Sequence, residues 1–446
     1  MKMRLFQLAP LATILLSTIT VGLRQIDKAP ESSLVAAVQR DMAAGKASAQ
    51  DEFWKLVEQK KAPIIEKIPG NDKQVLATFV WKDNSDTKNV IVNARVNGID
   101  PASDSRSHMR RLPGTNIWYL SHRLPIDAEI LYQFFVNPPE SNSGQSGPAL
   151  QLAARPDPFN PIQYPDKSDP LFDPSQPWRT GSIAQMPGVP ENPWLTRKSG
   201  VVTGLMQEHA FKSAFLTMAN PRTVWVYMSP GVQLQKPNVL ILFDGGTTYQ
   251  KRIPTTVILD NLYAAHKIGQ TVAIFVDNGG AARASDMNFN DAFVKFLTDE
   301  LLPWVQREYK FVADPSRTAV GGDSLCGLIG VYAALRRPDV FGKVLSQSGA
   351  FQFSNKNDAD NDEPEWLARQ FAQRPKSNVF FCLEVGRMED RPEGNGGTTL
   401  LASNRHLRDV LMAKGYGVHY FEVYGDHDPV HWRRALPAAL MVILGN

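Results

Sequence analysis

The alternation of apolar and polar residues divides the chain into two parts with different periods. Between residues 75 and 136, short stretches alternate with a period of two and are separated by polar or Pro-Gly breaks. Short strands at this spacing predict a small β-sandwich. The predicted strands lie at residues 75–81, 90–96, 117–120 and 130–136.

From residue 202 onward, continuous apolar runs alternate with helical segments, of which the clearest is 291–309. Continuous apolar strands between helices indicate a mostly parallel sheet that is covered on both faces. The sequence therefore predicts an α/β domain behind the β-sandwich. Its predicted strands lie at 223–228, 239–243, 271–276, 318–320, 344–346, 379–384 and 419–423.

The segments outside these two patterns are expected to direct the protein to export or to connect its domains. Lys2 and Arg4 precede an almost uncharged stretch, which is typical of a secretory signal or an uncleaved anchor and predicts a periplasmic or secreted protein. Prolines crowd the stretch between the two patterns and predict a long irregular connection. The predicted segments are a leader (1–28), a polar helical linker or docking helix (29–69), the β-sandwich (70–140), the proline-rich connection (141–200) and the α/β domain (201–446).

Composition excludes several classes of partner. The chain has 446 residues and a net charge of only +3, and no Lys/Arg-rich block stands out, so no nucleic-acid partner is expected. No membrane contact is expected beyond the N-terminal segment. The two cysteines, Cys326 and Cys382, lie in apolar surroundings and are predicted to be buried free thiols. No cluster has the spacing of a metal site, so no metal or organic cofactor is expected.

The strongest chemical motif lies at residues 318–336. A short apolar run leads into Gly322-Asp-Ser-Leu-Cys-Gly327, and an apolar helical stretch follows. Strand, tight turn and helix together are typical of a nucleophile elbow, which raises the hydroxyl of Ser324 above the sheet. The N–H of Leu325, at the start of the helix, is then a donor for an oxyanion. The alternative is that Ser324 only caps the helix.

The same residues, Gly322-Asp-Ser-Leu325, also spell the serine block of the GDSL hydrolases, and Asp428-Pro-Val-His431 supplies a D-x-x-H. In that family, however, the block follows the first strand of its domain. Here the strand-like runs 239–243 and 271–276 precede it. We therefore interpret the match as coincidental.

A serine nucleophile needs a base and an acid that orients the base. In α/β-hydrolases the order is serine, acid, histidine, each in a loop after a strand. His427 follows the last predicted strand and is the candidate base, with His431 as the second candidate. Glu389, in the loop after residues 379–384, is the preferred acid and Asp390 the rival. Either carboxylate could instead form a surface ion pair with Arg387.

The second oxyanion donor is expected in a loop after an earlier strand. Phe243-Asp-Gly-Gly246 fits, because glycines allow the backbone to approach a ligand closely. Gly246 or Gly245 would supply the N–H. Alternatively, the two glycines only form a turn.

Several of these motifs together resemble the enterochelin esterase family, and the resemblance extends over residues 70 to 440. It implies an esterase of the esterase D type, an α/β-hydrolase catalytic domain preceded by a β-sandwich. It also implies cleavage of the ester bonds of cyclic tri-catecholate siderophores. The resemblance rests on the elbow, on Val344-Leu-Ser-Gln-Ser-Gly349 and Gly425-Asp-His-Asp-Pro-Val-His-Trp-Arg433, and on Arg283-Ala-Ser-Asp-Met287, Asp157-Pro-Phe-Asn-Pro161 and Ala184-Gln-Met-Pro187.

Carried over position by position, the resemblance makes Ser324 the nucleophile, His427 the base and Glu389 the acid. Arg283, Trp432 and Arg433 fall where the family has binding or bracing residues. Cations attract an anionic ferric catecholate and aromatic side chains pack on its rings. Arg283 could instead pair with Asp286 or Asp277 as scaffold.

The expected partner is a small-molecule ester, and a ferric siderophore is the one that the resemblance implies. Asp323 stands where the family has a neutral residue and Cys326 where it has glycine. Two other functions therefore stay open. One is an exported carboxylesterase that acts on feruloyl, acetyl or other small esters. The other is a non-catalytic ligand-binding protein with the same fold.

Overall fold

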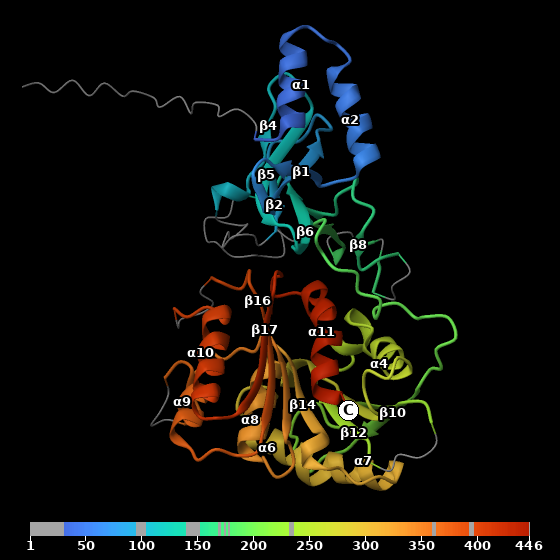
Figure 1. Cartoon of the computed structure of the whole chain (residues 1–446), viewed down its shortest axis with the longest axis vertical. Helices are drawn as coiled ribbons and strands as arrows, with labels where there is room; N and C mark the ends of the chain where they lie inside the picture. Colours follow the sequence, from blue (N-terminus) through green and yellow to red (C-terminus); the bar gives the residue numbers. More distant parts are fainter. Residues whose placement is uncertain are drawn as a thin grey trace, which may run out of the picture.

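The computed structural model describes residues 31–94, 104–139, 152–167, 171–173, 175–176, 179–231, 236–358, 363–391 and 397–445. These residues form two domains stacked along the long axis of the molecule (Figure 1). The predicted leader (1–28) lies outside the described residues. Within the described ranges, no helix combines the length and the apolar character needed to cross a membrane.

The first domain is a β-sandwich, as predicted. Phe79 from one sheet and Tyr132 from the other meet edge to face, with ring centroids 4.8 Å apart, in the core between the sheets. Strand β6 alternates buried and part-exposed positions, which is the period-two pattern that the sequence displays. One sheet has the order β1 (Ile64–Ile68), β2 (Asn71–Lys82), β5 (Ile117–Pro125) and β4 (Arg110–Arg111). The other has β3 (Val90–Asn93), β6 (Glu129–Val136), β9 (Gly181–Gln185) and β8 (Gln163–Tyr164), with β7 (Ala154–Arg155) also paired to β6.

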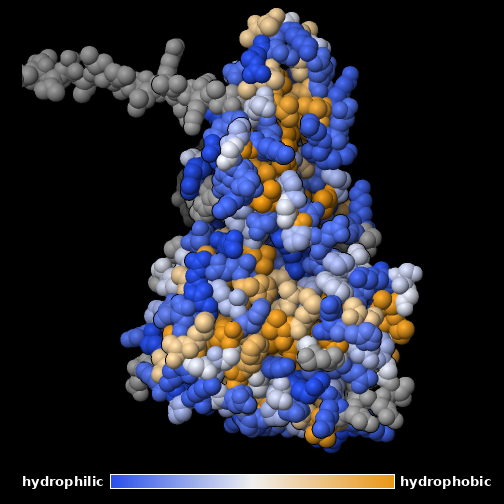
Figure 2. All heavy atoms as spheres, in the orientation of Figure 1, coloured by the Kyte–Doolittle hydropathy of each residue, from blue (hydrophilic) through white to orange (hydrophobic). Residues whose placement is uncertain are grey.

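For the described part of residues 29–69, the structure supports the predicted docking helix rather than a linker, with two helices and strand β1 in this segment. Helices α1 (Ser33–Ala43) and α2 (Ala49–Lys60) pack on the outer face of the first sheet, where Trp54 joins a buried cluster with Val80 and Ile117. Figure 2 shows hydrophilic residues on the outer sides of the two helices and hydrophobic residues between them. Burial of this apolar stripe makes the segment part of the domain.

The proline-rich stretch 141–200 also contributes to the sandwich. Strands β7, β8 and β9 all come from it, and β9 pairs with β6 from Glu129–Gln185 to Tyr132–Ser182. The predicted boundary at residue 140 is therefore too early. Strands of two residues have no period to detect, and their partners lie far away in the sequence.

The second domain has an eight-stranded sheet. Strands β10 and β11, at one edge, are antiparallel to their neighbours. The other six strands, β12 to β17, run parallel to one another. This strand order, with an elbow after the fifth strand along the chain, defines the α/β-hydrolase fold, so the predicted fold class is confirmed. The order is β10 (Leu205–Phe211), β11 (Arg222–Met228), β13 (Thr271–Val276), β12 (Asn238–Leu242), β14 (Thr318–Asp323), β15 (Lys343–Gln347), β16 (Phe380–Gly386) and β17 (Gly417–Val423).

Helices cover both faces of this sheet (Figure 1). One face carries α8 (Leu325–Arg336), α9 (Trp366–Gln373) and α10 (Leu400–Ala413), together with α6 (Asp291–Lys295), η5 (Phe296–Leu301) and α7 (Leu302–Tyr309). The predicted helix 291–309 is thus continuous in space, with a π-helical turn at η5. The other face carries α4 (Thr255–Ala264) and α11 (Pro429–Leu444). Shorter turns are η1 (Ser105–Ser107), η3 (Thr248–Arg252), η4 (Gly280–Ala282), α5 (Arg283–Asp286) and η6 (Pro315–Arg317).

The sandwich contacts the loops after β16 and β17 and the start of α11. Met388 is buried in the core cluster of the sandwich, and Tyr424 packs against the same cluster. Val430 packs with Tyr164 and Ile183 of the first domain. The contact therefore falls at the carboxyl ends of the last two strands, where ligands bind in α/β folds.

Candidate active site

Ser324 lies in the turn between β14 and α8 with φ 56° and ψ −121°, a backbone conformation that residues other than glycine rarely adopt. Hydrogen bonds hold this turn: the N–H of Ser324 donates to the carbonyl of Gln347 over 2.9 Å, and the N–H of Ala350 donates to the carbonyl of Ser324 over 3.1 Å. A Cβ at Gly327 would collide with Ser346 Oγ, so glycine lets α8 lie close to β15. Ser324 itself is part-exposed.

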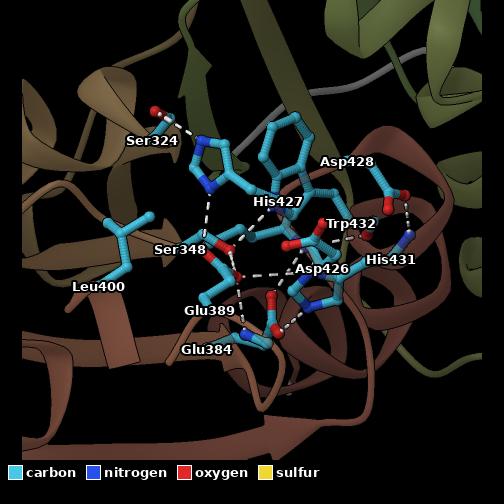
Figure 3. A network of polar contacts seen from close by, with 12 residues as sticks. Ser324, Ser348, Glu384, Glu389, Leu400, Asp426, His427, Asp428, His431 and Trp432 are labelled. Carbon is cyan, nitrogen blue, oxygen red and sulfur yellow. Dashed lines mark hydrogen bonds and ion pairs between the residues drawn. The ribbon is translucent and has the colours of Figure 1, made fainter. Parts of the chain in front are cut away.

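His427 lies between Ser324 and Glu389 (Figure 3). Its Nε2 is 3.0 Å from Ser324 Oγ, and its Nδ1 is 2.8 Å from Glu389 Oε2. The carboxylate accepts from Nδ1–H, which leaves the lone pair of Nε2 toward the serine hydroxyl. The three side chains come from the loops after β14, β16 and β17, the places expected from the sequence, and they form a serine–histidine–carboxylate relay.

Glu389 is buried, and both oxygens of its carboxylate accept hydrogen bonds. Its Oε1 accepts from Ser348 Oγ at 2.5 Å and from the N–H of Gly386 at 2.9 Å. Burial alone raises the pKa of Glu389, but the hydrogen bond and charge of His427 and the charge of His431 outweigh it and hold the pKa below its usual value. The rival Asp390 is exposed and contributes nothing to this network. The geometry therefore favours Glu389 as the acid.

Ser348 and Trp432 support Glu389 and His427. The indole N–H of Trp432 donates to Ser348 Oγ over 2.9 Å, and the Trp432 ring meets the His427 ring edge to face at 5.0 Å. Trp432 is only 6% exposed, so the prediction that it binds substrate is corrected to a bracing role. The sequence interpretation did not single out Ser348, although the Val344–Gly349 motif that carried the resemblance contains it.

The two predicted oxyanion donors are available. The N–H of Gly245 donates to the carbonyl of Val276 over 2.9 Å, which leaves Gly246 as the candidate in this loop. Among the described residues, neither the N–H of Gly246 nor that of Leu325 has a hydrogen-bond acceptor. A Cβ at Gly246 would lie 2.6 Å from the ring of Trp225, so the loop requires glycine there.

Arg283 binds the start of the same loop. Its Nε lies 3.0 and 2.8 Å from the two oxygens of Asp244, and its Nη2 lies 2.7 Å from Oδ2. The alternative scaffold role is supported, but its partner is Asp244. Among the described residues Arg283 forms no ion pair with Asp286 or Asp277, and Arg222 binds Asp286 at 2.6 Å. Arg283 thus braces the glycine loop and keeps 30% of its side chain exposed.

A buried group of possible metal ligands lies beneath the elbow. Ligand atoms of Asp244, Asp323 and Cys326 lie within 4.8 Å of one another. The guanidinium of Arg283 binds Asp244 and supplies the positive charge at this place. Burial and the charge of Asp244 together raise the pKa of Asp323 to about 7. The arrangement suits a carboxyl group that keeps its proton.

Arg433 and His431 contact residues other than Ser324. The Arg433 guanidinium stacks over the ring of Tyr164 at 4.8 Å, at the contact between the domains. His431, the second candidate base, is bonded to Glu384 and, over 2.7 Å, to the carbonyl of Asp426. The described residues therefore offer His427 alone as the imidazole within hydrogen-bond distance of Ser324.

The fold and the site define an ester hydrolase with an α/β-hydrolase catalytic domain. The family model "Putative esterase" matches residues 216–443, more than half of the chain, and the model of the enterochelin esterase N-terminal domain matches residues 76–195. The chain therefore belongs to this esterase family and carries the front domain of enterochelin esterases. The resemblance found in the sequence motifs is confirmed.

Individual relatives agree over most of their length. The iron(III) enterobactin esterase of Dickeya dadantii is 29% identical over 92% of this chain and 95% of that relative. The iron(III) salmochelin esterase of Escherichia coli O6:H1 is 24% identical over 93% of this chain and 98% of that relative. Among solved structures, the ferric enterobactin esterase of Salmonella typhimurium shares the fold, with a TM-score of 0.69 and 23% identity over 87% of this chain and 98% of that one.

Proposed function

We propose that this protein is a serine esterase that hydrolyses the ester bonds of a catecholate siderophore. The observation that carries the proposal is the continuous relay Ser324–His427–Glu389, with contacts of 3.0 and 2.8 Å, in a chain that contains both the esterase domain and the enterochelin esterase front domain. Relatives named for iron(III) enterobactin and iron(III) salmochelin support the substrate class.

In the proposed mechanism, His427 Nε2 accepts the proton of Ser324 as Oγ attacks the ester carbonyl. The carbonyl electrons move to oxygen, and the N–H groups of Leu325 and Gly246 hold the oxyanion. The C–O bond of the leaving alcohol then breaks, and His427 returns the proton to that alcohol. Glu389 stabilises the imidazolium throughout. Water repeats the same steps on the acyl-enzyme.

The substrate class agrees with the charges that border the site. A ferric tri-catecholate is an anion, and the part-exposed guanidinium of Arg283 contacts Asp244 in the loop that carries Gly246. We assign to Arg283 an attraction for this anion in addition to its contact with Asp244. The iron ion belongs to the substrate in this proposal.

The test incubates the purified protein with iron(III) enterobactin, methyl ferulate and p-nitrophenyl acetate and follows the products by liquid chromatography. Release of dihydroxybenzoyl-serine that is lost in Ser324→Ala supports the proposal. Cleavage of methyl ferulate or p-nitrophenyl acetate without cleavage of enterobactin would assign a general carboxylesterase. Binding of enterobactin without hydrolysis, and without labelling by a fluorophosphonate, would assign a binding protein.

A further inference from the structure

A second histidine–glutamate pair lies directly behind the relay, and the mechanism of a serine–histidine–carboxylate triad assigns no role to it. His431 of α11 is 2% exposed, and Glu384 of β16 is fully buried. Nε2 of His431 contacts Glu384 Oε1, and Nδ1 is 2.7 Å from the carbonyl of Asp426 (Figure 3). Each buried group stabilises the charge of the other, because an unpaired charge in the interior would destabilise the folded protein.

The hydrogen bonds restrict the protonation of this pair. A carbonyl oxygen can only accept, so Nδ1 of His431 carries a proton. The contact with Glu384 then leaves two states: an imidazolium beside a carboxylate, or a neutral imidazole beside a carboxylic acid. Gln347 donates to the other oxygen of Glu384 over 3.3 Å, and no other cation of the described residues pairs with Glu384.

The charges that face the ring favour the imidazolium. The neighbouring carboxylates are those of Glu384 on β16, Glu389 in the loop after β16, Asp426 in the loop after β17 and Asp428 at the N-terminus of α11. His427 contacts the other oxygen of Glu389. Burial lowers the pKa of His431, but the charge and hydrogen bond of Glu384 and the charges of Glu389 and Asp428 outweigh it and raise the pKa to about 10.

The ring also contacts the acid of the relay, since Nδ1 of His431 lies 3.7 Å from Glu389 Oε1. Glu389 is thus held between two imidazoles, His427 on Oε2 and His431 near Oε1. We propose that His431 is a positioning residue for ester hydrolysis: its fixed positive charge, held by Glu384, keeps Glu389 ionised and opposes protonation of His427. This inference rests on the proposed function.

The decisive variant is Glu384→Gln. The amide of glutamine can donate to Nε2, so the pair keeps its hydrogen bond and its volume while His431 becomes neutral at pH 7. The variant removes both charges of the pair, but the imidazolium is the one in contact with the relay, 3.7 Å from Glu389 Oε1, so its loss makes His427 easier to protonate. The acid limb of the pH profile of kcat/KM, measured on p-nitrophenyl acetate, then moves up by about half a unit or more.

The matched control is Glu365→Gln. Glu365, the N-cap of α9, contacts Nδ1 of His406 on α10 over 2.5 Å, and the His406 side chain is 52% exposed. Its profile is expected to coincide with that of the unaltered protein. An unchanged acid limb in Glu384→Gln, or an equal shift in Glu365→Gln, would overturn the inference.

Nitrogen-15 NMR of histidine-labelled, unaltered protein tests the charge of His431 directly. Both ring nitrogens of His431, assigned by their loss in His431→Gln, are expected to remain protonated at pH 8. A neutral ring at pH 8 would refute the inference. Failure of the unaltered protein to hydrolyse any ester would instead refute the proposed function, so the two outcomes are distinguishable.

Discussion

Replacement of Glu389 by glutamine tests the relay most sharply, because the structure dictates how the new amide must turn. Oε1 accepts two hydrogen bonds, from Ser348 Oγ and from the N–H of Gly386. The amide oxygen must occupy that position, which places the NH₂ group against Nδ1 of His427. Nδ1 then has to accept, so the proton moves to Nε2 and faces Ser324.

With a proton on Nε2, His427 cannot accept the proton of Ser324, although the three side chains keep their places. A wrong tautomer of this kind reduces kcat about 10⁴-fold, or about 5 kcal/mol in the activation free energy. Steady-state hydrolysis of p-nitrophenyl acetate measures the loss, and thermal unfolding verifies that Glu389→Gln is folded. The matched control is Asp390→Asn, which changes the exposed neighbour and is expected to alter kcat less than about twofold. A loss below tenfold in Glu389→Gln, or a comparable loss in Asp390→Asn, would refute the assignment of the acid.

Two further predictions concern the surroundings of the relay. Met388→Ala removes a side chain that is 3% exposed in the sandwich core and precedes Glu389, so we expect a loss of about 2–5 kcal/mol in unfolding free energy, measured with urea, and a lower kcat; unchanged stability would contradict the packing. Asp323 has a pKa raised to about 7, so the folded state keeps a proton that the unfolded state loses, and its contribution to stability falls as the pH rises from about 4 to about 7. Asparagine does not titrate, so the melting temperature of Asp323→Asn relative to that of the unaltered protein should rise when the pH is raised from 5 to 8. An equal difference in melting temperature at both pH values would contradict the prediction.

The relay could be predicted from sequence because its members obey local rules. Ser324 follows a strand in a glycine-flanked turn, and His427 and Glu389 lie in loops after the last strands, as the chain order requires. Pairings between distant residues could not be predicted in this way. The partner of Arg283 is Asp244, which lies after a different strand, and the burial of Trp432 depends on how α11 packs.

The front domain shows the same limit and explains why the site needs it. The contacts between the sandwich and the second domain join residues far apart in the sequence, and the sequence does not predict them. In the structure, Met388 and Tyr424 pack on the sandwich core, and each is within three residues of Glu389 or His427. Both loops reach out beyond the sheet (Figure 1), where the α/β domain alone would leave the apolar side chains in water. Ser324, in contrast, is held within the α/β domain by bonds to Gln347 and Ala350. The sandwich therefore fixes the acid and the base relative to a nucleophile that the other domain fixes, and the geometry of the relay depends on the contact between the two domains.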